Sequence, residues 1–155
     1  MIQTEKVEVV GNWLIKAKRE EVYKIVSNCE KMPENFPKIA KSINVIEKND
    51  TKLKVEAVAA SFGRFFPKVK INIDVELLPN RGYRCQTFNT TFNTTGEEEL
   101  LLLDDPEGTM VKYTYFLTIR NKRWKRLYVW LVKTFGLPFW KRAFIDRLNI
   151  MLTKK

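Results

Sequence analysis

Alternating apolar and polar positions dominate the middle of the chain. The strictest run predicts a strand with one buried face, and its apolar members are Val69, Ile71, Ile73, Val75 and Leu77. Less regular alternation predicts further strands at residues 6–17, 43–47, 53–59, 83–92, 98–103 and 110–119. Short turn sequences at residues 79–82 and 104–108 join neighbouring strands, which favours an antiparallel sheet. Within the first strand, Gly11 and Asn12 predict a bulge.

A helical period interrupts the strands early in the chain. Val22, Ile25 and Val26 lie at helical spacing within residues 17–26 and predict a short amphipathic helix. A second short helix is predicted within residues 29–40, where prolines punctuate the pattern.

The last predicted element is a long basic helix over about residues 121–153. Its first half carries an apolar stripe formed by Trp124, Leu127, Tyr128, Leu131 and Phe135. The sequence Gly136-Leu137-Pro138 must break or kink this helix. The stripe then resumes at Leu137, Trp140, Phe144, Leu148 and Met151.

The length of 155 residues suits one domain spanning residues 1–155. The chain contains no histidine and two cysteines, which excludes a Cys/His zinc site and a His-based triad, and we expect no cofactor. Neither a signal peptide nor a run of about 18 apolar residues is recognisable. We therefore expect a cytoplasmic protein.

The net charge of +10 is concentrated at the C-terminal end. Residues 120–155 contain 11 basic residues and one acidic residue, Asp146, whereas residues 1–119 balance 17 basic against 17 acidic residues. This asymmetry indicates either a surface for an anionic partner or a helix face that is simply solvated.

The order of these elements resembles a known superfamily. Residues 15–26, then Phe36-Pro37, then Lys41-Ser42 before a strand, are similar to the opening of the START-like, polyketide-cyclase and birch-allergen-like helix-grip proteins. The resemblance implies an α+β fold in which a curved antiparallel sheet of six to seven strands wraps around a long kinked C-terminal helix. It also implies a hydrophobic cavity between sheet and helix, which in such proteins holds lipids, quinones, polyketides or steroids. The chain departs from the pattern at Asn28, where the family usually has an acid, and in its basic tail.

Three phenylalanines lie in the predicted loop at residues 61–67, where polar residues are usual, and they are candidate ligand-binding residues: Phe62, Phe65 and Phe66. They form either a lid over the cavity or a cap on the core. The apolar helix stripe adds further candidates for the cavity wall, namely Trp124, Tyr128, Leu131 and Phe135.

Polar candidates lie on two strands. Tyr113 and Tyr115 are expected to face inward, where they either orient a ligand or act as hydrogen-bonded core tyrosines. Arg84 shares a face with Phe88; if that face is inward, Arg84 anchors a carboxylate or phosphate, and if it is outward, Arg84 is a surface charge. The acidic run at residues 97–99 is interpreted as solvated.

The far side of the predicted C-terminal helix combines basic and large apolar residues, which suits an anionic membrane surface. The candidate membrane-surface residues are Lys122, Lys125, Arg126, Val129, Trp130, Lys133, Phe139 and Arg142. A protein partner is an alternative, and nucleic acid ranks last because no nucleic-acid motif is present.

These observations predict binding or transport of a hydrophobic small molecule: a lipid, isoprenoid, quinone or polyketide-like compound. The alternative is a cyclase or hydratase. The absence of histidine leaves few groups for acid–base chemistry, so a non-enzymatic role is favoured.

Overall fold

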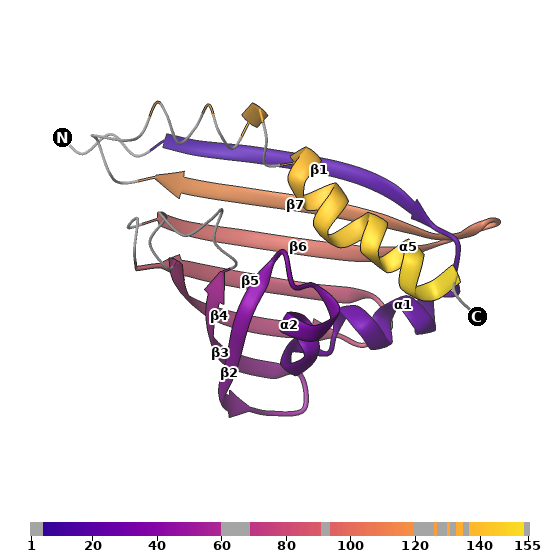
Figure 1. Ribbon diagram of the computed structural model, residues 1–155, viewed down its shortest axis with the longest axis horizontal. Coiled ribbons are helices and arrows are strands. Elements are labelled where there is room, and N and C mark those ends of the chain that lie inside the picture. Colours follow the sequence, from indigo (N-terminus) through magenta and orange to yellow (C-terminus); the bar gives the residue numbers. More distant parts are fainter. Residues whose placement is uncertain are drawn as a thin grey trace.

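The computed structural model describes residues 5–59, 69–90, 94–119 and 137–153, together with residues 126, 130, 133 and 134. Over these ranges a seven-stranded antiparallel sheet carries helices on one face (Figure 1). The strands are β1 (Glu5–Ile15), β2 (Ala40–Lys48), β3 (Lys52–Ala59), β4 (Val69–Leu78), β5 (Gly82–Asn89), β6 (Thr94–Asp105) and β7 (Gly108–Ile119). The helical elements are α1 (Arg19–Val26), η1 (Cys29–Lys31), α2 (Met32–Asn35), α4 (Leu137–Trp140), the π-helical η3 (Lys141–Ile145) and α5 (Asp146–Thr153).

The strand order is β1-β7-β6-β5-β4-β3-β2. Each strand from β2 to β7 therefore pairs with its neighbour in sequence, and β1 pairs with β7 at one edge. Helices α1 and α2 lie in the connection between the two edge strands, β1 and β2. The predicted antiparallel sheet with two short helices after the first strand is confirmed.

Two local predictions were wrong. β1 pairs with β7 in unbroken register from Glu5 to Ile15, so Gly11 and Asn12 form no bulge. Gly11 instead leaves space for a ring, because a Cβ there would collide with the Trp13 indole. Strand β6 begins at Thr94 rather than near residue 98.

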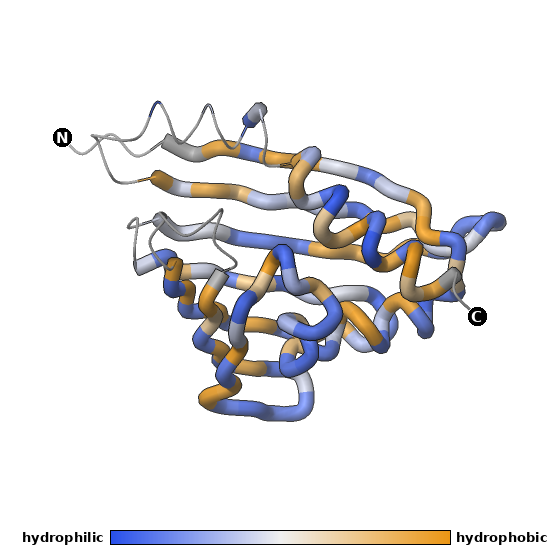
Figure 2. The backbone as a smooth tube through the Cα atoms, viewed as in Figure 1, coloured by the Kyte–Doolittle hydropathy of each residue, from blue (hydrophilic) through white to orange (hydrophobic). Residues whose placement is uncertain are grey.

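The alternation predicted for the inner strands is confirmed by burial. Along β7, Val111, Tyr113, Leu117 and Ile119 are buried, and along β3 the buried residues are Leu53, Val55 and Ala57. Figure 2 shows the same pattern as alternating hydrophobic and hydrophilic colours along β3 and β4. The inner face of the sheet therefore presents apolar side chains to the helices.

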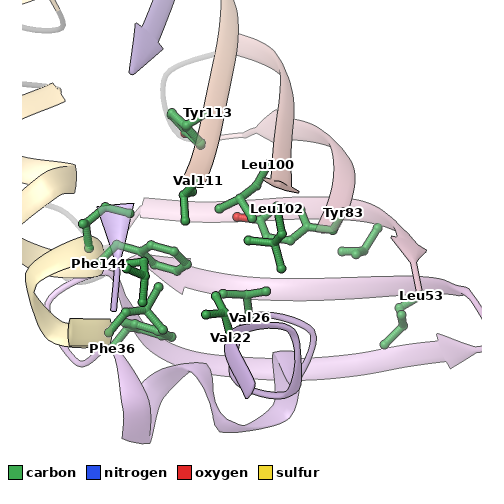
Figure 3. Packing of buried hydrophobic residues seen from close by; sticks show 14 of the residues in the cluster. Val22, Val26, Phe36, Leu53, Tyr83, Leu100, Leu102, Val111, Tyr113 and Phe144 are labelled. Carbon is green, nitrogen blue, oxygen red and sulfur yellow. The ribbon is translucent and has the colours of Figure 1, made fainter. Parts of the chain in front are cut away.

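The core lies where α1, the C-terminal helix and the inner face of the sheet meet (Figure 3). Its labelled members come from all three layers and include Val22, Val26, Phe36, Leu100, Leu102, Val111 and Phe144. The helical stripe predicted for the C-terminal region is confirmed in its second half, because Phe144 and Leu148 are almost fully buried.

A column of stacked rings joins the C-terminal helix to the sheet. Tyr113 of β7 stacks on Trp140 with ring centroids 3.9 Å apart, and Trp140 stacks on Phe144 at 4.6 Å. Phe144 in turn stacks on Phe36 at 4.4 Å, which ties the helix to the segment after α2. Trp13 of β1 packs against Trp140 at 5.2 Å. This aromatic column holds the helix at a defined position over the sheet.

Polar contacts secure the far end of the same helix. Asn149 accepts a hydrogen bond from the backbone N–H of Lys16 at 3.3 Å, and Arg147 donates to the backbone carbonyl of Asn35 at 2.9 Å.

The predicted helix over about residues 121–153 is described from Leu137 onward, and most of its earlier half lies outside the described residues. No helix in the described part of the chain is long and apolar enough to cross a membrane.

The aromatic column predicts a large effect for Phe144→Ala. Phe144 is 1% exposed and stacks on two rings, so its removal leaves a cavity and should lower the free energy of unfolding by about 3–5 kcal/mol. Urea denaturation measures this change. The matched control is Phe139→Ala in the preceding turn, where the side chain is 37% exposed and the loss should stay below about 1 kcal/mol. Equal losses in the two variants would contradict the role given to the column.

Candidate functional site

A cavity of about 280 Å³ lies between the inner face of the sheet, the α1–α2 region and the C-terminal helix. Its described apolar wall comprises Val26, Met32, Ile39, Ala40, Ile43, Val55, Ala57, Ile71, Ile73, Val75, Trp140 and Phe144. Its described polar wall comprises Cys29, Tyr83, Cys85, Thr87, Asn89, Thr94, Glu98, Tyr113 and Tyr115. The wall is therefore mainly apolar with a small number of polar groups.

The cavity arises because some inward-facing side chains of the sheet are only partly covered by other parts of the protein. Val75 of β4 is buried, whereas Ile71 and Ile73 on the same strand and face are only half-buried. Ile43 of β2 is likewise half-buried. These three isoleucines line the cavity, so part of their surface faces open space instead of the core.

A larger hollow of about 790 Å³ is lined mainly by outward-facing residues of the sheet, together with the inner-face residues Leu53, Val75, Cys85 and Glu98. Charged side chains from β3 to β6 dominate it, and among them Arg84 pairs with Glu99 at 2.8 Å. Because most of its charged side chains are exposed to solvent, this hollow resembles an ordinary charged surface. The inner cavity is the better candidate for a binding site.

Glu98 brings a carboxyl group into the inner cavity. The hydroxyl of Tyr83 donates a hydrogen bond to Glu98 Oε1 at 2.6 Å, and the hydroxyl of Tyr113 also donates to this carboxyl group. The register explains the cluster: Tyr83, Leu100 and Tyr113 are aligned across β5, β6 and β7, so both tyrosines are diagonal neighbours of Glu98. We call Glu98, Tyr83 and Tyr113 the carboxyl cluster.

Burial shifts the acidity of the whole carboxyl cluster. It raises the pKa of Glu98 above its ordinary value, and the hydrogen bonds from Tyr83 and Tyr113 oppose part of that rise. Burial, reinforced by the neighbouring Glu98 charge, raises the pKa of Tyr83 and of Tyr113 well above the usual tyrosine value. Both phenols therefore stay protonated at neutral pH, and Glu98 is the member that can gain or lose a proton.

Two free cysteines line the same cavity. Burial raises the pKa of Cys85 well above its ordinary value and raises that of Cys29 as well, with the Glu98 charge adding to both shifts. Both are thus neutral thiols at neutral pH rather than thiolates, which makes them poor nucleophiles. Among the residues that the structure describes, no group of carboxylates and thiols is arranged to hold a metal ion.

Tyr115 lies beside the carboxyl cluster because it pairs directly with Glu98 across β6 and β7, and Gly96 on β6 leaves room for its ring. A Cβ on Gly96 would collide with the Tyr115 ring and with the hydroxyl of Thr87. The glycine thus lets the Tyr115 ring lie close to the sheet. Tyr113 and Tyr115 both face inward as alternation predicts, and both line the cavity.

Arg84 and Phe88 require a correction. Both lie on the outer face of β5: the Arg84 side chain is 58% exposed and pairs with Glu99, and Phe88 is 45% exposed. Of the two orientations that the sequence left open, the outward one is found, so neither Arg84 nor Phe88 is a ligand-binding residue of the inner cavity. The inward face of β5 carries Tyr83 and Cys85 instead.

Other predicted residues lie outside the described part of the chain. The three loop phenylalanines, Phe62, Phe65 and Phe66, belong to this group, as do Trp124, Tyr128, Leu131 and Phe135 of the helix. The same holds for Lys122, Lys125 and Val129 among the candidate membrane residues. The candidate membrane residues that the structure does describe are all exposed or nearly so: Arg126, Trp130, Lys133, Phe139 and Arg142.

Sequence reasoning missed Glu98 by treating residues 97–99 as solvated, which is wrong for Glu98. Glu97 faces outward and is exposed, and Glu99 faces outward to pair with Arg84, but Glu98 points into the cavity between them. The inward position of Glu98 beside Tyr113 could have been inferred from the sequence, because the turn at residues 105–108 sets the register of β6 on β7. That register makes Tyr113 a diagonal neighbour of Glu98.

No protein-family model matches this sequence, and no curated protein sequence matches it. Solved structures do match. The di-domain ARO/CYC BexL from the BE-7585A biosynthetic pathway has a TM-score of 0.79 at 11% identity, covering 97% of this chain and 51% of that chain. The present chain therefore spans about half the length of that di-domain protein.

Two other similar structures are matched over nearly their whole length. Zhui aromatase/cyclase from Streptomyces sp. R1128 has a TM-score of 0.75 at 12% identity, covering 97% of this chain and 94% of that chain. Truncated norcoclaurine synthase from Thalictrum flavum has a TM-score of 0.72 at 11% identity, covering 100% and 98%. The chain has the helix-grip fold of these proteins, which confirms the fold expected from the sequence.

Proposed function

We propose that this protein binds an apolar small molecule in the cavity between the sheet and the C-terminal helix. The cavity itself carries the proposal: it measures about 280 Å³ and its wall is mainly apolar. Concave sites of this composition are the usual places where proteins hold small molecules. Each square ångström of apolar surface removed from water contributes roughly 25 cal/mol to binding. A lipid, isoprenoid, quinone or polyketide-like compound has this chemistry.

The similar structures support the proposal at the level of the fold. Two of them are named as aromatase/cyclases and one as norcoclaurine synthase, so their names refer to small organic molecules. Within the proposal, Phe62, Phe65 and Phe66 gate the cavity, and the helix stripe from Trp124 to Phe135 extends its wall.

Filling the cavity should weaken binding. Ala57 is a buried residue of β3 that lines the cavity, so the ring in Ala57→Phe would occupy the space of a ligand. We expect titration calorimetry with 2-naphthylmethanol, a neutral apolar probe, to show binding to the wild type and at least tenfold weaker binding to Ala57→Phe, or about 1.4 kcal/mol.

The matched control is Val58→Phe, which adds the same ring to the next residue of β3, outside the cavity lining. Its affinity for 2-naphthylmethanol should stay within about twofold of the wild type. The proposal fails if Ala57→Phe binds the probe as tightly as the wild type, or if the wild type does not bind it.

A second candidate function is proton-transfer catalysis, and the carboxyl cluster is the observation that favours it. A buried carboxyl group with a raised pKa exchanges protons closer to neutral pH than an exposed one. Glu98 thereby supplies the acid–base group that the sequence, without histidine, did not reveal. In this role Glu98 would remove a proton from the carbon next to a ligand carbonyl and later return it.

Hydrogen–deuterium exchange at the activated CH₂ of 2-tetralone, followed by NMR in D₂O, tests this candidate. Glu98→Gln should slow protein-catalysed exchange by roughly 100-fold, because the amide cannot accept the proton. Glu97→Gln removes a carboxylate from the outer face of the same strand and should leave the rate unchanged. Exchange that is no faster with the wild type than in buffer would reject catalysis and leave the binding function standing.

We also propose that the basic C-terminal region docks on an anionic membrane surface. Trp130 is 54% exposed and Phe139 is 37% exposed, and exposed basic residues such as Arg126, Lys133 and Arg142 lie in the same region of sequence. Aromatic rings among basic side chains suit the boundary between headgroups and acyl chains. In this role docking brings the cavity near an apolar source of ligand.

Vesicle sedimentation tests the docking. Arg126→Glu combined with Lys133→Glu should weaken binding to phosphatidylserine-containing vesicles at least tenfold, since each basic residue near such a surface contributes about 1 kcal/mol. Binding of the wild type should also weaken as salt is added. The control, Lys52→Glu with Lys54→Glu, makes the same charge change on exposed residues of β3. Equal weakening in both double variants would contradict docking through the C-terminal region.

A further inference from the structure

We propose that the cavity selects apolar ligands that carry a protonated amine and discriminates against apolar carboxylates, through the carboxyl group of Glu98. This inference rests on the proposed binding function and specifies the ligand class for it. It is the opposite of one alternative that the sequence left open, in which an inward-facing Arg84 anchors an anionic head group.

The first argument is the charge of the cavity wall. Among its described lining residues, Glu98 is the only aspartate, glutamate, lysine or arginine. No lysine or arginine is found in that described lining. Arg84 lies on the opposite face of the sheet and is paired with Glu99. An anionic ligand would thus meet a like charge and no described cation, which is unfavourable in a poorly solvated site.

The second argument is the unused bonding capacity of Glu98. An ionised carboxylate can accept about four hydrogen bonds. Tyr83 and Tyr113 supply two, and both phenols lie on strands flanking β6. Since Glu98 lines the cavity, its remaining acceptor sites are available to a ligand. An ammonium group fits them best, because a charge-assisted hydrogen bond is roughly twice as strong as a neutral one.

The third argument is that none of the described residues facing Glu98 is a permanent counter-ion for it. The titratable groups that face it are Tyr83 and Cys85 from β5, Tyr113 and Tyr115 from β7, and Cys29 from η1. The cysteines and the two hydrogen-bonded tyrosines are neutral at neutral pH, because burial raises their pKa values. A ligand ammonium would supply the missing positive charge.

The same electrostatics predict how binding depends on pH. Burial raises the pKa of Glu98, and a bound ammonium group would lower it again by favouring the ionised form. Amine binding should therefore weaken as the pH falls through the pKa of Glu98, since the protonated carboxyl carries no charge. A neutral ligand should show little change over the same range.

Titration calorimetry with three probes that share a naphthyl body tests the inference: 2-naphthylmethylamine, 2-naphthylmethanol and 2-naphthoate. The wild type should bind the amine at least about tenfold more tightly than the carboxylate, with the alcohol between them. Glu98→Gln should reduce the preference of amine over carboxylate to within about threefold and leave alcohol binding within about twofold. The control Glu97→Gln removes one charge from the outer face of β6 and should keep the wild-type preference.

A second measurement does not depend on the folding of a variant. The affinity of the wild type for amine and alcohol is measured between about pH 5 and pH 8, where a primary amine stays protonated. The amine should lose affinity toward low pH and the alcohol should not. Selectivity for the carboxylate, or an amine preference that survives in Glu98→Gln, overturns the inference while leaving the binding function intact. If none of the three probes binds to the wild type, both proposals fail.

Discussion

The stacking of aromatic rings between the sheet and the C-terminal helix is the interaction on which the rest of the structure depends. Tyr113, Trp140, Phe144 and Phe36 form one continuous column, with ring centroids 3.9–4.6 Å apart. Rings are stiff and wide, so they hold the helix at a set distance from the sheet as well as binding it there. Smaller apolar side chains line the space beside the column, including Ala57, Ile71 and Ile73, and they leave it incompletely filled. The cavity is thus a consequence of how the helix is attached.

The same column connects packing to chemistry through Tyr113. One face of its ring stacks on Trp140, while its hydroxyl group donates to Glu98. The orientation of that hydroxyl is therefore determined by the core, and Glu98 receives a partner that cannot rotate away freely. Tyr83 performs the equivalent role from β5, where it is 8% exposed. A carboxyl group placed among apolar residues is tolerated because rigid donors satisfy part of its hydrogen-bonding capacity.

Much of the fold could be predicted from the sequence, because alternation and turn residues act locally. The strict alternation of β4 and the turn sequences at residues 79–82 and 104–108 were sufficient to predict an antiparallel sheet. The orientation of β5 was undecided, since Tyr83 and Cys85 on one face and Arg84 and Phe88 on the other are similar mixtures of polar and apolar residues. Pairing with β4 decides it: Cys85 lies opposite Val75, and Tyr83 opposite Leu77. The environment of Glu98 is set by diagonal neighbours on two other strands, which alternation within one strand does not reveal.

Strand β6 shows how one register determines both the charge inside the cavity and the charges outside it. Three successive glutamates alternate across the sheet, so Glu98 enters the cavity while Glu97 and Glu99 remain with solvent and Arg84. The short connection from Asp105 to Gly108 sets this register, and Gly108 is confined to glycine by its φ of 150° and by the carbonyl oxygen of Ile15. A slip by one residue would turn Glu97 and Glu99 inward and expel Leu100 and Leu102 from the core. Because the burial of these leucines forbids the slip, the core itself specifies that the described wall of the cavity contains a single carboxylate.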